Sequence, residues 1–144
     1  MTIDTVRERV IGALISSPSD IHKVLAKQFS SRQESFHVVT LDAAHSVTSV
    51  KLISMGTLDR TIVHCRDILY WAIKASAATV IIAHNHPSGS LVASKEDDAL
   101  TTRVKEACDI MGIPLLDHMI YSKHAYVCYS ETKPEILWSK GAIQ

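Results

Sequence analysis

The sequence predicts an α/β fold in which a mixed β-sheet is flanked by helices. Two observations predict it: several segments repeat apolar residues at helical spacing, and they alternate with short runs rich in β-branched residues. The chain has 144 residues, of which 47% are hydrophobic, so it has the size of one globular domain and enough apolar residues for a buried core. Strands mixed with helices favour layers of helices packed on a sheet.

Two helices are expected before the first strand. Apolar residues recur at helical spacing over residues 3–15, and Ser19 is a suitable N-cap for a second helix that ends near residue 28. We therefore interpret residues 1–30 as an N-terminal helical segment and residues 31–144 as the main domain.

The main domain is expected to contain five strands and two long helices. The first two strands should form a hairpin, and the second helix should end at Gly112, a natural C-cap. One helical turn is expected in the tail, with Trp138 packed against the domain. The predicted strands are residues 34–42, 46–56, 79–84, 113–122 and 125–130, and the predicted helices are residues 65–77 and 94–112.

Composition excludes several classes of protein. Lysine plus arginine equals aspartate plus glutamate, 15 of each, so no overall charge attracts nucleic acid or anionic lipid. The three cysteines include no C-x-x-C pair and fit reduced thiols in a cytoplasm. No apolar run approaches the roughly 20 residues that span a bilayer, and the start lacks the order of a signal peptide. We expect a cytoplasmic protein with no membrane contact.

The stretch "HNHPSGSLVASKED", residues 84–97, carries the most definite chemistry. His84 and His86 lie at the end of the apolar run "TVIIAH", and in an extended segment residues i and i+2 point to the same side. Pro87 favours an extended conformation at His86. Both imidazoles are therefore expected at the carboxyl end of a buried strand, where they can reach one cation.

The serine and aspartate that follow have two interpretations. The pattern S-x-x-D, here Ser94 to Asp97, is a capping box at the start of a helix. Helical phase, however, puts Asp97 on the inward stripe with Leu100 and Val104, whereas Asp98 projects toward water. A carboxylate aimed inward needs a cation or several donors. Two histidines and one carboxylate are a ligand set of catalytic zinc sites, which suit hydrolysis.

Hydrolysis at such a site also needs a proton acceptor. The sequence contains no H-E-x-x-H, so the acceptor must come from another segment. Spacing alone leaves six acids open: Glu34, Asp42, Asp59, Asp67, Asp117 and Glu131.

These residues carry a family likeness. The order H-x-H-P-x-G, four residues, then S-x-x-D resembles the JAMM motif of JAB/MPN-domain metallopeptidases. The stretches "IIAHNHPSG", "SKEDDALT" and "GIPLLDHMIYS" are similar to the bacterial RadC family in particular. The likeness covers roughly residues 31–131 and includes "QESFHVVTLD" and "GTLD" in the same order.

The resemblance implies a cytidine-deaminase-like sandwich that holds one zinc ion per chain through His84, His86 and Asp97. It also implies that Glu34, in "QESF", is the general base that takes a proton from the attacking water and returns it to the leaving amine. Ser94 would donate to the carbonyl oxygen as it becomes an oxyanion. The implied reaction is cleavage of a peptide or isopeptide bond in a peptide or protein substrate.

Two departures from the family pattern bear on other roles. Full-length RadC proteins carry an upstream helical domain that resembles helix-hairpin-helix DNA-binding units, and the roughly thirty residues before Glu34 are too few for one. The loop "GSLVAS" lacks the proline and the extra polar residue expected before the motif serine, but no ligand is lost. A DNA repair-associated factor and a metal-stabilised interaction module without turnover are the alternatives to a hydrolase; DNA is not favoured by charge.

The remaining histidines and cysteines are weaker candidates. His118, in "LLDHM", shares a strand face with Leu116 and Ile120 and is either a core residue or a residue that orients a metal-binding histidine. Cys65 lies beside His64, but adjacent residues rarely face each other, so an idle thiol is favoured over a nucleophile. A deaminase is excluded because H-x-E and P-C-x-x-C are both missing. No feature of the sequence indicates an oligomeric state.

Overall fold

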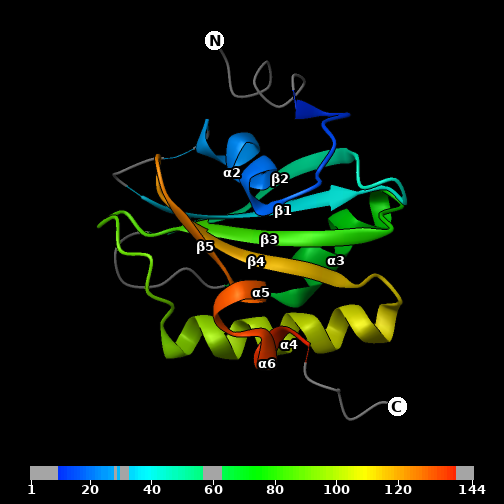
Figure 1. Cartoon of the computed structure of the whole chain (residues 1–144). Coiled ribbons are helices and arrows are strands. Elements are labelled where there is room, and N and C mark those ends of the chain that lie inside the picture. The colour runs from blue at the N-terminus through cyan, green and yellow to red at the C-terminus, as the bar shows by residue number, and fades with distance from the viewer. Residues whose placement is uncertain (1–9, 28, 30–32, 57–62, 139–144) are drawn as a thin grey trace.

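A computed structural model describes residues 10–27, 29, 33–56 and 63–138 (Figure 1). The elements are α2 (Pro18–Ala26), β1 (Glu34–Leu41), β2 (Val47–Gly56), α3 (Cys65–Lys74), β3 (Thr79–Asn85), α4 (Lys95–Met111), β4 (Leu115–Tyr121), β5 (Tyr126–Cys128), α5 (Tyr129–Thr132) and α6 (Pro134–Leu137). Helix α2 covers one face of the sheet, and α3 to α6 lie on the other (Figure 1). The predicted α/β fold with a mixed sheet flanked by helices is confirmed.

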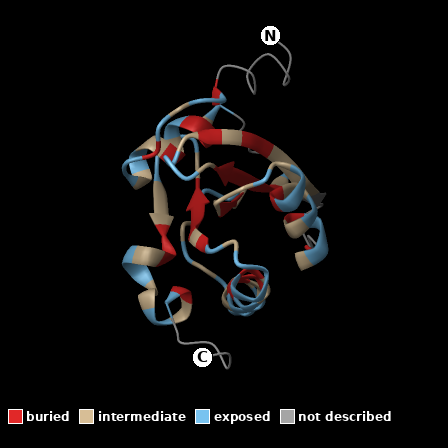
Figure 2. Ribbon diagram, turned by 90° about the vertical axis from the view of Figure 1, so that its right-hand side faces the viewer, coloured by how far each residue is buried: buried red, intermediate tan, exposed pale blue. Residues whose placement is uncertain are grey.

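The five strands form one sheet in the order β2-β1-β3-β4-β5. β1 pairs antiparallel with β2 and β3, whereas β3 and β4 are parallel and are joined by α4. The predicted hairpin of the first two strands is therefore present. Because β3 is the central strand and helices cover both faces, its apolar sequence is buried on both sides. Figure 2 shows the buried residues concentrated on the central strands.

Alternation along β3 divides the interior into two cores. Val80 and Ile82 face α3 and α4, whereas Ile81 and Ala83 face α2. The next residue in the first series is His84, so its side chain lies on the α4 side of the sheet.

Among the described residues, no helix is both long enough and apolar enough to cross a bilayer.

Two predictions near the N-terminus are wrong within the described residues. The helix expected over residues 3–15 does not include residues 11–15, because Gly12 takes a positive φ of +88° and Leu14 pairs with Ser46 as an isolated bridge; residues 1–9 lie outside the described part of the chain. Ser17, not Ser19, precedes the next helix, because Pro18 occupies its first turn and the Asp20 carboxylate accepts from the Ser17 N–H at 3.1 Å.

Two further predictions fail near the C-terminus. The last strand ends at Cys128, and the residues after it form α5, because the Asp117 carboxylate accepts from the Ser130 N–H at 3.0 Å and from its hydroxyl at 2.6 Å. Trp138 is 63% exposed, so most of its side chain is not packed against the described domain. The expected C-cap is present: Gly112 follows α4 with a φ of +70°.

Candidate metal centre

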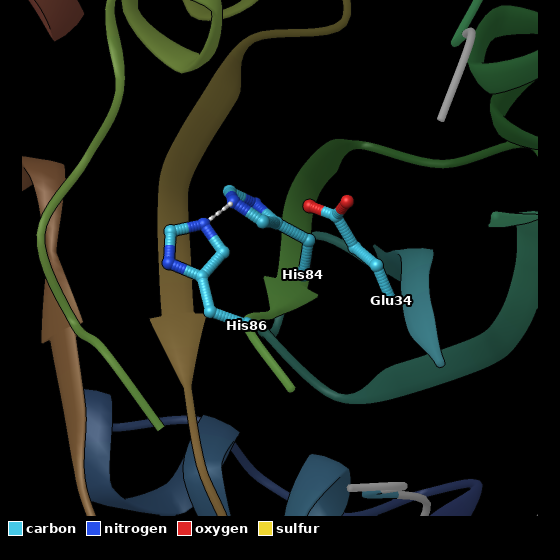
Figure 3. A group of neighbouring side chains, drawn as sticks. All are labelled: Glu34, His84 and His86. Atoms are coloured by element: carbon cyan, nitrogen blue, oxygen red, sulfur yellow. Dashed lines mark hydrogen bonds between the residues drawn. The ribbon is translucent and has the colours of Figure 1, made fainter. Parts of the chain in front are cut away.

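Two imidazoles meet at the carboxyl end of β3. The Nε2 atoms of His84 and His86 are 3.0 Å apart (Figure 3). The chain turns directly after them: Pro87 occupies a turn closed by a bond from the Gly89 N–H to the His86 carbonyl, and Gly89 has a φ of +81°. This turn brings the Ser90 carbonyl to 3.0 Å from His86 Nδ1. A carbonyl only accepts, so His86 donates from Nδ1 and its neutral ring presents a lone pair at Nε2.

A carboxylate from the first turn of α4 joins the two rings. Asp97 Oδ1 is 3.2 Å from His84 Nε2, and Asp97 Oδ2 is 3.4 Å from His86 Nε2. Asp97 is also half of a capping box: its Oδ2 accepts from the Ser94 N–H at 2.8 Å, and its own N–H donates to the Ser94 hydroxyl at 3.0 Å. The inward direction predicted for Asp97 is therefore observed, and the cap and the approach to the histidines occur together.

The neighbouring acid does not follow its prediction. Asp98 does not project into water: its carboxylate accepts from the Tyr129 hydroxyl at 2.7 Å and pairs with Lys133 Nζ at 2.7 Å. Both partners follow β5 in the sequence, so the helical phase of α4 alone could not predict these contacts.

Electrostatics at this centre favour positive charge. Burial alone raises the pKa of Asp97, but the close approach of the His84 and His86 rings outweighs burial and holds the pKa well below its ordinary value. The Asp97 carboxylate would accept a hydrogen bond from the protonated His86 ring, and this raises the pKa of His86 against the opposing effect of burial. The carboxylate is therefore ionised, and it stabilises a cation placed between the rings.

Glu34 lies beside the two histidines (Figure 3). Ligand atoms of Glu34, His84 and His86 all lie within 4.8 Å of one another, a group that could hold a metal ion. The register of the sheet explains the approach: Phe36 on β1 pairs with His84, and Glu34 lies two residues earlier on the same face. Of the six acids left open by spacing, Asp59 lies outside the described residues.

Asn85 fixes the strand that carries Glu34. Its side chain points away from the two imidazoles, as predicted, and its Oδ1 accepts from the N–H and the hydroxyl of Ser35, each at 2.7 Å. Its Nδ2 donates to the Gln33 carbonyl at 3.0 Å. The residues on both sides of Glu34 are therefore bonded to the end of β3.

The spacing of the three closest groups fits zinc. A tetrahedral zinc ion with ligands at about 2.0–2.1 Å separates neighbouring ligand atoms by about 3.3 Å. The separations among His84, His86 and Asp97 are 3.0, 3.2 and 3.4 Å. Two imidazoles and a carboxylate are also a donor set that zinc accepts. The ligand atoms of Glu34 and the two histidines lie within 4.8 Å of one another, so Glu34 also borders this centre.

His118 lies directly behind His84. Its Nε2 is 2.9 Å from His84 Nδ1, and it is fully buried. Burial lowers its pKa well below the ordinary value, so the ring is neutral. Of the two interpretations left open for His118, the contact favours a residue that orients a candidate ligand, while its stacking on Tyr129 at 4.7 Å also makes it part of the core.

Comparison with known proteins assigns the family. The model of the RadC-like JAB domain matches residues 15–134, most of the chain. The chain belongs to the RadC family. It is 45% identical over 100 residues to a UPF0758 protein of Streptococcus sanguinis, 42% over 118 residues to one of Clostridium perfringens and 38% over 124 residues to one of Thermotoga maritima.

These alignments cover most of this RadC-like chain but only part of each relative. They include 69%, 81% and 86% of the chain and 44%, 52% and 55% of the relatives, respectively. The chain therefore spans about half the length of the curated relatives it matches. The JAB domain and the His/Glu/His group together identify the candidate centre of this RadC-like domain as a possible metal site.

One residue of this site was missed in the sequence. Thr101 is fully buried, and its hydroxyl lies 2.5 Å from His118 Nδ1. A signal was present: Thr101 follows Asp97 by four residues, so it occupies the same inward face of the helix, where a polar side chain needs a partner.

Proposed function

We propose that this RadC-like domain is a zinc-dependent hydrolase that cleaves a peptide or isopeptide bond in a peptide or protein substrate. The observation that supports it most strongly is the match between the separations of His84, His86 and Asp97 and the edges of a zinc tetrahedron, with Glu34 alongside. These three residues would hold one ion per chain. A zinc ion bound there would supply Lewis acidity, which lowers the pKa of water and polarises a carbonyl group.

The protein's own residues would supply the proton transfers and the positioning. Glu34 would accept a proton from the attacking water and return it to the leaving amine, a role that its position beside the two histidines supports. The Ser94 hydroxyl oxygen accepts from the Asp97 N–H at 3.0 Å, so its hydrogen is free to donate to the substrate carbonyl as negative charge develops. We infer a cytoplasmic location from the three free cysteines.

Metal analysis of the purified chain tests the first step. We expect about one zinc per chain, lost in His84→Ala and Asp97→Ala and retained in His124→Ala, a control at an exposed bend after β4. Glu34→Gln should retain zinc, because Glu34 acts on the water and does not hold the ion. A chain that neither carries nor takes up zinc refutes the proposal, and loss of zinc in Glu34→Gln with retention in Asp97→Ala would exchange the roles of the two acids.

Hydrolysis is tested separately with a peptide and isopeptide library. We expect cleavage by the wild-type chain and a rate lower by about 100-fold or more in Glu34→Gln, since general acid–base catalysis contributes about 10²–10⁴-fold. If the zinc-loaded wild type and Glu34→Gln are equally inert, the domain is a metal-stabilised interaction module without turnover.

A second candidate is binding of single-stranded DNA, which one surface feature favours. Tyr70 is 53% exposed and packs edge-on against Trp71, while the Nζ atoms of Lys51 and Lys74 lie 4.6 and 5.4 Å from the Trp71 ring centre. Aromatic rings flanked by cations suit base stacking and phosphate contact. Salt-dependent binding of labelled single-stranded DNA that is lost in Trp71→Ala would support this role, and no binding at low salt would exclude it.

A further inference from the structure

A chain of hydrogen bonds connects two of the candidate ligands through the interior. His84 Nδ1 is 2.9 Å from His118 Nε2, and His118 Nδ1 is 2.5 Å from the Thr101 hydroxyl oxygen. The Thr101 hydroxyl donates to the backbone carbonyl of Asp97 at 2.7 Å. The chain therefore starts on one candidate ligand on β3, passes through β4 and α4, and ends on the backbone of another.

The direction of every bond in this chain follows from its last member. A carbonyl oxygen can only accept, so the single hydroxyl hydrogen of Thr101 is committed to Asp97. Thr101 must then accept from His118, which places the proton of the neutral His118 ring on Nδ1. His118 Nε2 carries a lone pair as a result and accepts from His84 Nδ1–H.

We propose that His118 and Thr101 are positioning residues that hold His84 in the tautomer whose Nε2 lone pair is available to a metal ion. The inference rests on the proposed zinc site and deepens it, because it names what prepares a ligand before metal arrives. His86 is held in the same tautomer by the Ser90 carbonyl at 3.0 Å. Both Nε2 lone pairs and the Asp97 carboxylate then converge as three acceptors with separations of 3.0–3.4 Å, an arrangement that a cation stabilises.

The residues around this series of hydrogen bonds exclude water that could replace any of its members. His84, His118 and Thr101 are 2%, 0% and 0% exposed. Tyr129 stacks on His118 with an angle of 6° between the rings, and Phe36 stacks on His84 at 6.0 Å. In this dry environment a donor without its acceptor is costly, so the ordering of the protons is stable.

The experiment measures the position of the His84 proton and zinc affinity in one set of variants. His118→Phe keeps a ring beside Tyr129 but removes both nitrogens, and Thr101→Val keeps the shape of Thr101 but removes the hydroxyl. His118→Gln restores one acceptor and one donor. His22→Phe is the matched control, because His22 bonds the Ser122 carbonyl and packs on Tyr126, away from this chain.

We expect nitrogen-15 NMR of the metal-free wild type to show the His84 proton on Nδ1. In His118→Phe this proton should redistribute toward Nε2, and zinc affinity, measured by competition with a chelator, should fall by about 10- to 100-fold. Thr101→Val should change both in the same direction, His118→Gln should recover part of the affinity, and His22→Phe should match the wild type.

The inference is overturned if His118→Phe and Thr101→Val both keep the wild-type position of the His84 proton and the wild-type zinc affinity. A His84 proton on Nε2 in the metal-free wild type overturns it as well. If His118→Phe does not fold, Thr101→Val decides by the same two measurements. A wild type that binds no zinc refutes the proposed function instead, and the proton position in the metal-free chain still decides the inference.

Discussion

Replacement of Asp98 by alanine should destabilise the fold far more than an ordinary surface change on α4. Asp98 accepts from the hydroxyl of Tyr129, which is 1% exposed, and pairs with Lys133. A hydrogen bond to a charged group contributes about 1.5–3 kcal/mol. The side chains of Asp98 and Lys133 are 28% and 30% exposed, so solvent screens this ion pair, and it adds at most about 1 kcal/mol.

We therefore expect Asp98→Ala to lower the free energy of unfolding by about 2–3 kcal/mol, since the Tyr129 hydroxyl is left buried without this acceptor. For a domain of this length the loss corresponds to a fall in Tm of about 7–10 °C. Urea denaturation and thermal melting followed by circular dichroism measure both values. Glu106→Ala, an exposed change on the same helix, is the control and should stay within about 0.5 kcal/mol of wild type.

A double-mutant cycle assigns the effect to the Tyr129 contact. Asp98→Ala and Tyr129→Phe should couple by about 1–2 kcal/mol, because the second change removes only the hydroxyl that the first leaves without this acceptor. Additive effects, or an Asp98→Ala variant as stable as Glu106→Ala, would refute the assignment of Asp98 to the interior side of α4.

Three more outcomes are expected. Zinc affinity should weaken as the pH falls, because His86, whose pKa the Asp97 hydrogen bond raises above 6.5, must lose its proton to bind metal; a flat chelator-competition profile from about pH 5 to 8 would contradict this. Gly112→Ala should cost about 1–2 kcal/mol in urea denaturation, because its φ of +70° strains a side-chain-bearing residue; an unchanged midpoint would be inconsistent with that cap. A thiol reagent on the folded chain should modify Cys65, which is partly exposed, well before Cys108, whose pKa burial raises to about 12; equal rates by mass spectrometry would count against this.

The fold was predictable where one short segment determines the structure. The apolar run before His84 predicted a strand buried on both faces, and the apolar stripe at helical spacing placed the helix after Ser94 correctly. The capping box and the inward phase of Asp97 were both visible in the sequence, because each depends only on residues within the first two turns of one helix.

Several of the parts that failed depend on contacts between segments far apart in the chain. Asp98 was assigned to solvent because helical phase treats one helix alone, whereas its partners Tyr129 and Lys133 come from residues over thirty positions later. The strand after residue 125 was overextended because the contact between Asp117 and Ser130 starts a helix there. Spacing also left six acids open as the general base, because only the pairing of β1 with β3 brings Glu34 to the histidines.

Asn85 lies between the two histidines, so the two faces of the segment of residues 84–86 have different roles. One face presents both imidazoles, and the other clamps the start of β1 through Ser35 and Gln33. Insertion of one residue here would exchange the faces, because side chains alternate along a strand. The site therefore cannot be grafted onto another scaffold as the contiguous β3–α4 segment alone. The graft must also include the first residues of β1, in the same register with β3.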